Sequence, residues 1–246
     1  MRRAIVVGAS SGIGRALVLQ LAHDGWVVGA TARRVALLEA LRGGIATAVH
    51  VRAMDVSAPE AAAAGLEELI AEMGGAELVV LNAGAGHVNP ELAWEVEREA
   101  IDVNVRGFTA LADAAMRHFL RAGSGHLVSI SSIAARRGHG AAPAYGASKA
   151  YISTYMDALR HRVAGLRARI AITDIQPGFV DTAMAQGPHV FWAATPGEAA
   201  RQICGAIRAR RKRAVVTRRW APIAWMMRWL PDVLYHRLGR DRIGGR

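Results

Sequence analysis

The chain has 246 residues, of which 52% are apolar and 21% are charged, which suits one large α/β domain and excludes wholesale disorder. Its formal net charge is +11, but no nucleic-acid-binding motif accompanies that charge, so we expect no nucleic acid as a partner. No apolar run approaches the ~18 residues of a membrane-spanning helix. The single cysteine, Cys204, predicts a reducing, cytoplasmic location, and the scattered histidines predict no metal site.

The N-terminal region predicts a phosphate-binding turn between a strand and a helix. A short apolar strand, Ala4–Val7, leads directly into Gly8-Ala9-Ser10-Ser11-Gly12-Ile13-Gly14, and a helical pattern follows. Such a junction points backbone N–H groups and a helix N-terminus at a phosphate, and its glycines permit a close approach of the ligand. Glycine-rich turns are frequent, so the position of this one after the first strand carries the prediction.

The second predicted strand, Trp26–Ala32, ends where the adenosine ribose of a dinucleotide would lie. An acidic residue at this point selects NAD, whereas here Ala32 is followed by Arg33 and Arg34. A guanidinium pairs with a 2′-phosphate in bidentate fashion, so we favour Arg33 as a contact to NADP. The alternative is that these arginines only solvate a loop.

Two further predicted strands, Ile45–Met54 and Leu78–Leu81, also end in residues that suit a dinucleotide. Asp55, followed by Val56, would accept a hydrogen bond from an adenine amino group, or would cap the helix that follows. The fourth strand continues into Asn82-Ala83-Gly84-Ala85-Gly86, where small residues let the backbone pass beside a flat ring. An ordinary turn is the alternative there.

A long helical pattern is predicted from Glu91 to Arg121, and Asn104 lies inside it. Asparagine is a poor residue for the middle of a helix because its side chain competes for backbone hydrogen bonds. Asn104 therefore indicates a kink, or a backbone carbonyl that is freed to bind water.

The stretch His126–Ala150 carries the side chains that indicate chemistry. It begins as an apolar strand, ends that strand in a serine cluster, and continues through a loop into a helix that carries Tyr145 and Lys149. Residues four apart share a helix face, and a nearby ammonium favours the phenolate and so lowers the pKa of a tyrosine. A serine hydroxyl beside that tyrosine would hold a carbonyl oxygen. The pattern predicts protonation of that oxygen, although Y-x-x-x-K alone is common by chance.

Alternating strands and helices continue to the end of the domain. A strand at Ala168–Ile175 is followed by Pro177 and Gly178, a helix begins with Thr195 as its N-cap, and a short strand occupies Ala214–Thr217. This order predicts an α/β fold with a parallel sheet covered on both faces. Ligands of such sheets bind at the carboxyl ends of the strands, where the candidate residues all fall.

These motifs, in this order and at these separations, resemble the short-chain dehydrogenase/reductase family in its classical subgroup. The match spans Ala4–Thr182, with a looser one over Thr195–Thr217. It implies a single Rossmann-like, doubly wound domain (residues 1–217) with a seven-stranded, mainly parallel sheet in the order 3-2-1-4-5-6-7. Residues 218–246 would form a basic, tryptophan-rich extension of the same domain. Val7 departs from the family's threonine, which affects only a bracing hydrogen bond of the glycine loop.

The resemblance also implies roles for individual residues. The catalytic set would be Asn104, Ser132, Tyr145 and Lys149, because Ser132 stands 13 residues before the tyrosine. Lys149 would also bind the nicotinamide ribose, and Asn104 would hold a water that links Lys149 to solvent. The NADP(H) site would comprise Gly8, Ser10, Ser11, Gly12, Ile13, Gly14, Arg33, Asp55, Val56, Asn82, Ala83, Gly84, Tyr145, Lys149, Pro177, Gly178, Val180 and Thr182.

The function predicted from these residues is NADPH-dependent reduction of a ketone or aldehyde, or the reverse oxidation of an alcohol. One alternative is an NAD-dependent alcohol dehydrogenase, which the arginine at position 33 argues against. Another is a non-catalytic NADP(H)-binding regulatory protein, which the intact set of four catalytic residues argues against.

The sequence also predicts the walls of the substrate pocket and the helices that pair in the assembly. Walls are expected at Ala85–Val88, Ala134–Pro143 and Ala183–Trp192, and the apolar residues of the last segment suggest a hydrophobic carbonyl or alcohol substrate. The resemblance implies a homodimer or homotetramer that pairs the helices Glu91–Arg121 and Ala144–Leu166.

The extension beyond Arg218 predicts a short amphipathic helix. An apolar stripe recurs at helical spacing, Pro231 then ends the helix, and Val233, Leu234 and Leu238 begin a second one. The stripe comprises Pro222, Trp225, Met226, Trp229 and Leu230. We favour packing of this stripe on the domain or on another subunit, with contact to an anionic membrane surface as the alternative.

Overall fold

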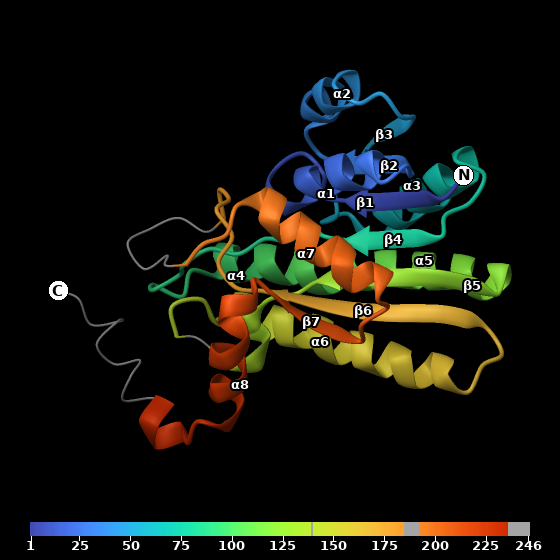
Figure 1. Cartoon of the computed structure of the whole chain (residues 1–246). Helices are drawn as coiled ribbons and strands as arrows, with labels where there is room; N and C mark the ends of the chain where they lie inside the picture. The colour runs from blue at the N-terminus through green and yellow to red at the C-terminus, as the bar shows by residue number, and fades with distance from the viewer. Residues whose placement is uncertain (139, 185–191, 236–246) are drawn as a thin grey trace.

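The computed structural model describes residues 1–138, 140–184 and 192–235. Seven strands form one sheet in the order β3-β2-β1-β4-β5-β6-β7, and every pairing in it is parallel (Figure 1). The predicted sheet and strand order are therefore confirmed. The strands are β1 (Arg3–Val7), β2 (Val27–Ala32), β3 (Val49–Ala53), β4 (Leu78–Leu81), β5 (Ser124–Ile130), β6 (Arg169–Pro177) and β7 (Arg213–Val216).

Helices cover both faces of the sheet, as Figure 1 shows. One face carries α1 (Gly12–His23), α2 (Val35–Gly43) and α7 (Pro196–Arg208), and the other carries α3 (Pro59–Glu72), α5 (Phe108–Ala122) and α6 (Pro143–Ala164), with α4 (Trp94–Ile101) against α6. Strand β1 shows how one strand is buried by helices on both faces of the sheet. Ala4 and Val6 are buried under the first set of helices, and Ile5 and Val7 under the second. A strand buried on both faces needs an unbroken apolar run, and β1 has one.

The region predicted as one long helix differs from the prediction. Helix α4 ends at Ile101, a π-helical turn occupies Asp102–Gly107, and α5 begins at Phe108. The turn follows from packing, since a Cβ on Gly107 would lie only 2.0 Å from the carbonyl oxygen of Val56. Asn104 lies in this turn, which is the kind of local widening often found at functional sites.

Two other departures lie between β2 and β4. Helix α2, which the sequence reading did not predict, buries Leu38 and Leu41 against the sheet. The third strand was predicted over Ile45–Met54, but only Val49–Ala53 pairs with β2, because the chain first completes the turn after α2.

The C-terminal extension is anchored by one tryptophan rather than by the predicted stripe. Trp220, at the end of a 3₁₀ turn (η3, Arg218–Trp220), is 4% exposed and packs on Gly178 and Phe179. Helix α8 (Ala221–Trp229) follows and buries Ala224, but Trp225 is 67% exposed and Trp229 is 65% exposed. Packing of these two side chains on the domain is therefore contradicted, while packing on another subunit stays a prediction. Leu238, which was predicted to belong to a second short helix, lies outside the described residues.

Within the described ranges, no helix has both the length and the apolar character needed to cross a membrane.

Candidate active site

The glycine loop between β1 and α1 is shaped by contacts that only glycine allows. Gly8 has a φ of +84°, and a Cβ there would lie 2.7 Å from the backbone nitrogen of Ala83. A Cβ on Gly14 would lie 2.0 Å from the carbonyl oxygen of Gly8. That oxygen also accepts a hydrogen bond of 2.7 Å from the side chain of Asn82. The loop is thus fastened to the end of β4, and Asn82 and Ala83 support it.

The N-terminus of α1 is open to an anion. Ser11 is the N-cap residue but its side chain makes no capping hydrogen bond, and the first turn carries no acidic residue. Thr182 lies above the loop, because a Cβ on Gly12 would come within 2.9 Å of its methyl carbon. Free N–H groups at a helix N-terminus and a backbone without side chains suit a phosphate, so these residues fit the pyrophosphate of a dinucleotide.

Two arginines follow β2, and they face different partners. The Arg34 guanidinium donates hydrogen bonds of 3.0 Å to the hydroxyls of both Ser10 and Ser11 in the glycine loop. Arg33 is exposed and acts on Asp55. Sequence reasoning favoured Arg33 and did not anticipate that Arg34 would reach the loop. Both cations therefore follow the carboxyl end of β2, and Arg34 lies against the glycine loop.

Asp55 makes a local turn. Its Oδ1 accepts hydrogen bonds from the backbone N–H of Ser57 at 3.0 Å and from the Ser57 hydroxyl at 2.8 Å. These bonds, and more weakly the charge of Arg33, hold the pKa of the Asp55 carboxyl below its usual range. Asp55 is not the N-cap residue of α3, which is Ala58. Val56 is buried beneath the π-helical turn.

Helix α6 places Tyr145 in its first turn. Pro143 opens the helix, and the Glu97 carboxylate accepts a hydrogen bond of 2.8 Å from the N–H of Ala144, satisfying one of the free donors of the helix end. The Tyr145 ring lies on the backbone of Gly86, where a Cβ would come within 2.2 Å of it. Ser132 lies close enough to Tyr145 for its side chain to lower the pKa of the phenol.

Lys149 lies one helical turn beyond Tyr145 and is almost fully buried. Its Nζ donates a hydrogen bond of 3.1 Å to the carbonyl oxygen of Ile130 and lies 5.7 Å from the centre of the Tyr145 ring. Burial lowers the pKa of Lys149 to about 8, and the negative charge of Asp174 opposes this fall. A Cβ on Gly84 would come within 3.0 Å of the ammonium nitrogen, so the small residues after β4 leave room for it.

Asn104 joins this group from the π-helical turn. Its Oδ1 accepts the N–H of Ala85 at 2.9 Å, and its Nδ2 donates to the Ala85 carbonyl at 2.6 Å and to the Ser148 hydroxyl at 2.9 Å. Because the Asn104 side chain both accepts a hydrogen bond from Ala85 and donates one to it, it fixes the backbone after β4 beside Lys149. Ser148, which sequence reasoning missed, links Asn104 to Tyr145. Its hydroxyl accepts the bond from Asn104 and donates a hydrogen bond of 2.8 Å to the carbonyl oxygen of Tyr145.

The pKa of Tyr145 is not set mainly by the charge of Lys149, although the sequence predicted that it would be. Burial raises the pKa of Tyr145, and its hydrogen bond with Ser132 lowers it to a smaller extent. The prediction that the ammonium lowers the tyrosine pKa is therefore wrong as the leading effect. The phenol is held in its protonated form at neutral pH.

The segment after β6 begins at the carboxyl end of that strand and packs locally. Pro177 ends the strand, Gly178 lies against Trp220, and Val180 is buried and pairs with Ala194. Of the predicted pocket walls, Met184 and Trp192 are about half exposed. Residues 139 and 185–191, which include Val190 and Phe191, lie outside the described part of the chain.

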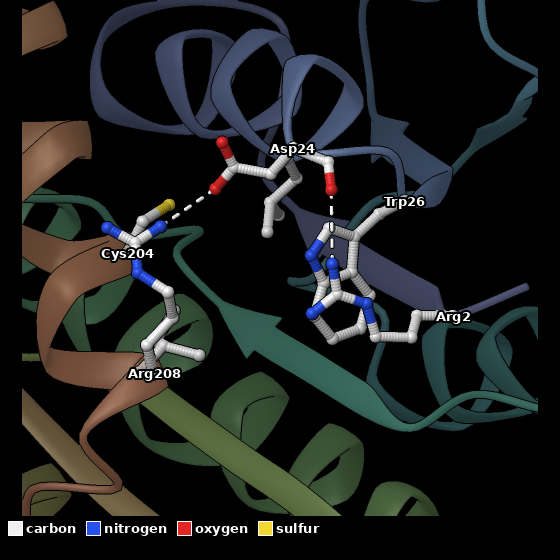
Figure 2. Close-up of a pocket in the computed structure, with 7 residues that line it drawn as sticks. Arg2, Asp24, Trp26, Cys204 and Arg208 are labelled. Atoms are coloured by element: carbon white, nitrogen blue, oxygen red, sulfur yellow. Dashed lines mark hydrogen bonds and ion pairs between the residues drawn. The ribbon is translucent and has the colours of Figure 1, made fainter.

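Two cavities accompany these elements. One of about 500 Å³ lies between the loop residues 134–138 and 140 and helix α6, where Gly146, Ala147 and Ala150 line it rather than Tyr145 or Lys149. The other, of about 230 Å³, is lined by residues near the amino ends of β1 and β2 and by α7, among them Arg2, Trp26 and Cys204, and by none of the candidate residues (Figure 2). Burial raises the pKa of the Cys204 thiol there to about 12, so Cys204 is no nucleophile. Among the described residues, no cluster of potential metal ligands is found.

The sheet, the glycine loop and the Ser132–Tyr145–Lys149 cluster define a class, that of dinucleotide-dependent α/β oxidoreductases. Residues 2–189 match the family model described as short chain dehydrogenase. The chain belongs to the short-chain dehydrogenase family, and as such is an oxidoreductase of alcohol and carbonyl groups.

Three relatives illustrate the similarity. An "uncharacterized oxidoreductase" of Myxococcus xanthus is 43% identical over 184 residues, which cover 73% of this chain and 72% of that protein. The farnesol dehydrogenase of Aedes aegypti is 32% identical over 189 residues, which cover 73% of this chain and 77% of the relative. The alcohol dehydrogenase of Thermococcus sibiricus, solved with 5-hydroxy-NADP, superposes with a TM-score of 0.77 at 25% identity, covering 88% of this chain and 96% of that one.

Proposed function

We propose that this protein is an NADP(H)-dependent oxidoreductase that interconverts a ketone or aldehyde and the corresponding alcohol. The observation that carries the proposal is the convergence of Ser132, Tyr145 and Lys149 at the carboxyl edge of the sheet, beside an anion-ready glycine loop. Fold alone would not support an activity, but side chains able to hold and protonate a carbonyl oxygen do.

Each residue has a distinct part in the proposed mechanism. The bound nicotinamide cofactor supplies the hydride when a carbonyl is reduced. Tyr145 donates the proton to the carbonyl oxygen, and its raised pKa keeps that proton in place at neutral pH. Ser132 holds the same oxygen through its hydroxyl. In the oxidising direction the Tyr145 phenolate takes a proton from the alcohol, and the raised pKa means that less of this tyrosine is ionised at neutral pH.

Lys149 and Asn104 support this chemistry. The buried ammonium would hold the ribose next to the nicotinamide, and its charge would stabilise the phenolate that forms when Tyr145 gives up its proton. Asn104 holds the Ala85 backbone beside that ammonium and would take part in returning a proton from solvent.

The preference for NADP(H) is supported by charge. Arg33 and Arg34 follow β2, where an acidic residue would bind the ribose of NAD. Two guanidinium groups in this position favour a 2′-phosphate. The binding of an NADP analogue by the Thermococcus sibiricus enzyme fits this view. A hydrophobic substrate is supported by the exposed Met184 and Trp192 near the expected pocket, and by the relative that acts on farnesol.

A panel of ketones, aldehydes and alcohols, assayed by cofactor absorbance with NADPH and with NADH in parallel, tests the proposal. We expect reduction of an apolar carbonyl compound with NADPH in preference to NADH. An NAD-dependent dehydrogenase would show the opposite preference. A non-catalytic NADP(H)-binding protein would bind the cofactor and turn over none of the panel.

Assembly and location complete the proposal. We propose a homodimer or homotetramer formed through α5 and α6, which light scattering at micromolar concentration would test against a monomeric mass. A reducing, cytoplasmic compartment suits a chain with one buried cysteine. Neither nucleic acid nor metal has a part in this function.

A further inference from the structure

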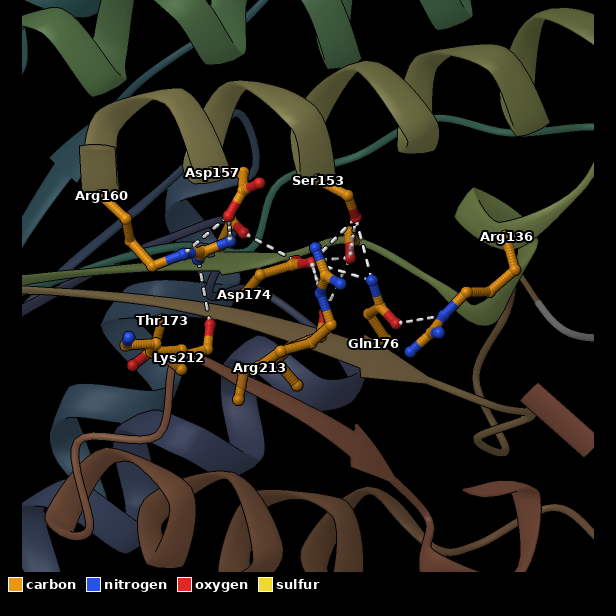
Figure 3. Close-up of polar contacts among 12 residues, drawn as sticks. Arg136, Ser153, Asp157, Arg160, Thr173, Asp174, Gln176, Lys212 and Arg213 are labelled. Carbon is orange, nitrogen blue, oxygen red and sulfur yellow. Dashed lines mark hydrogen bonds and ion pairs between the residues drawn. The ribbon is translucent and has the colours of Figure 1, made fainter. Parts of the chain in front are cut away.

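A buried carboxylate, Asp174, lies between the sheet and α6 (Figure 3). It comes from the middle of β6, pairs in register with Ser129 of β5, and has 0% of its surface exposed. Burying a carboxylate costs several kcal/mol unless hydrogen bonds and charges compensate. The proposed mechanism gives this residue no role, so its presence here calls for a physical explanation.

The carboxylate is surrounded by donors. Oδ1 accepts hydrogen bonds from one serine of β5 and from the serine just after its end, and Oδ2 accepts one from α6 and one from β6. The distances are 2.6 Å from Ser131 Oγ, 3.2 Å from Ser129 Oγ, 2.8 Å from Ser153 Oγ and 2.9 Å from Gln176 Nε2. An ionised carboxylate only accepts hydrogen bonds, so four donors suit the ionised form.

The same strand end that Asp174 holds also carries the proposed catalytic groups. Ser129 and Ser131 bind Asp174. The carbonyl oxygen of Ile130, which lies between them, accepts a hydrogen bond from the Lys149 ammonium. Ser132, the residue after Ser131, acts on the phenol of Tyr145. A shift of this strand end would therefore move both the acceptor of Lys149 and the partner of Tyr145.

Asp174 also acts on Lys149 through its charge. Ser153, which binds the carboxylate, lies one helical turn beyond Lys149 on α6, so the carboxylate and the ammonium share a buried region. Burial favours the neutral amine, and the charge of Asp174 opposes that effect on the pKa of Lys149. Charges attract more strongly in such a region than in water.

We propose that Asp174 is a positioning residue, whose buried carboxylate keeps the Lys149 ammonium charged and fixes the end of β5 beside Tyr145. The inference rests on the proposed function of Lys149 and Tyr145. Its physical content, the charge state of a buried lysine, can nevertheless be measured without cofactor or substrate.

Other charged groups face this carboxylate from the neighbouring elements. Arg213 of β7 places Nε 3.6 Å from Oδ2, and its side chain is partly exposed. Arg136 reaches Gln176 at 2.8 Å from the loop after β5. Asp157 and Arg160 form an ion pair of 2.7 Å further along α6. Arg213 competes most directly with Lys149 for the carboxylate.

The sequence makes a direct test possible, because it contains only two lysines, Lys149 and Lys212. Protein labelled with ¹³C at the lysine ε-carbon should give two signals, which Lys212→Arg assigns. Following the Lys149 signal by NMR as the pH is raised measures the pKa of Lys149 in the intact chain. In the unsubstituted protein we expect a midpoint near pH 8.

Asp174→Asn keeps the side-chain volume and removes the charge. We expect the Lys149 midpoint to fall by about one pH unit or more, as on losing a nearby opposite charge. The alkaline limb of kcat/KM for carbonyl reduction should move the same way. Thr173→Val, the adjacent buried residue with its side chain toward the other face, and Ser153→Ala, which keeps the charge, should move the midpoint much less. An unchanged midpoint in Asp174→Asn would overturn the proposal.

A second variant covers the case in which Asp174→Asn does not fold. Arg213→Gln, at the partly exposed edge strand, leaves the carboxylate to act on Lys149 alone and should raise the midpoint slightly. A fall, or no change, would contradict the proposal. Absence of cofactor binding and turnover in the unsubstituted protein would instead overturn the proposed function, while the NMR result would still decide the effect of Asp174.

Discussion

The ring of Tyr145 rests on the backbone of Gly86, where an added Cβ would lie 2.2 Å from a ring carbon. The two residues come from different elements, Tyr145 from the first turn of α6 and Gly86 from the segment after β4. Gly86 therefore sets how far the phenol stands from the glycine loop. Any side chain at that position must displace the ring.

The first prediction is that Gly86→Ala lowers kcat/KM by about 100-fold, because a displacement of ~1 Å in a reacting group costs that much. Cofactor binding should change much less, since the glycine loop is untouched. Gly205→Ala is the matched control: a Cβ at Gly205, inside α7, meets nothing within 4 Å, so activity should be retained. Steady-state kinetics of both variants decide the matter, and equal activity would show that the ring can move aside.

The second prediction separates the two arginines after β2. Arg33→Ala should raise KM for NADPH about tenfold and leave NADH nearly unaffected, because only the 2′-phosphate loses a partner. Arg34→Ala should weaken both coenzymes, because Ser10 and Ser11 lose the guanidinium that holds the loop. Coenzyme titrations of the two variants measure this. Equal loss with both coenzymes in Arg33→Ala would assign the phosphate contact elsewhere.

The third prediction concerns stability and pH. Burial lowers the pKa of His126 from 6.5 to about 4, so the folded state excludes a proton that the unfolded chain binds between these values. Above pH 6.5 His126 is neutral in both the folded and the unfolded state, so its full contribution to stability is present. As the pH drops toward 4, only the unfolded chain gains the proton, and the free energy of unfolding should fall by up to about 3 kcal/mol.

His126→Gln should flatten this pH dependence while keeping a donor for the Thr173 hydroxyl, which lies 2.8 Å away. Thr173→Val leaves the imidazole buried and should keep the slope. Denaturant unfolding at several pH values provides the measurement. A slope in His126→Gln equal to that of the unsubstituted protein would show that other groups cause it.

The fourth prediction tests the anchor of the C-terminal extension. Trp220→Ala should lower the free energy of unfolding by about 3–5 kcal/mol, as for other buried tryptophans, and should loosen the Gly178 segment. Trp225→Ala removes the same side chain from an exposed position of α8 and should cost little. Similar losses from both would imply that Trp225 is covered, for example by a second subunit. Loss of binding to anionic vesicles in Trp225→Ala alone would favour the membrane alternative.

Much of the fold could be predicted from the sequence because its signals are local. Apolar runs such as Ala4–Val7 mark strands buried on both faces, and Thr195 with Glu198 forms the capping box that the spacing indicates. The exceptions have long-range causes. The π-helical turn around Asn104 depends on the contact of Gly107 with Val56, which no local pattern contains.

The candidate site divides in the same way. Tyr145 and Lys149 could be recognised because four residues on a helix define one face. Arg34 and Asp174 could not, since their partners lie on other elements. One signal for Asp174 was available. It is a carboxylate in the middle of a predicted buried strand, and Ser129 and Ser131 stand two residues apart at the end of another strand. For α8, periodicity shows that an apolar stripe exists but not what covers it. Trp225 and Trp229 are mostly exposed rather than buried on the domain, and coverage of the stripe by another subunit stays a prediction.

The central claim is that Tyr145 is the proton donor of an NADP(H)-dependent carbonyl reductase, and Tyr145→Phe tests it most directly. The substitution removes the hydroxyl and keeps the ring that packs on Gly86. The measurement is kcat for the best carbonyl substrate, paired with the NADPH dissociation constant from fluorescence titration. We predict that kcat falls by about 1,000-fold or more, a loss within the range that general acid–base catalysis supplies, while NADPH binding stays within about threefold. A variant that keeps a tenth or more of the unsubstituted rate would contradict the account.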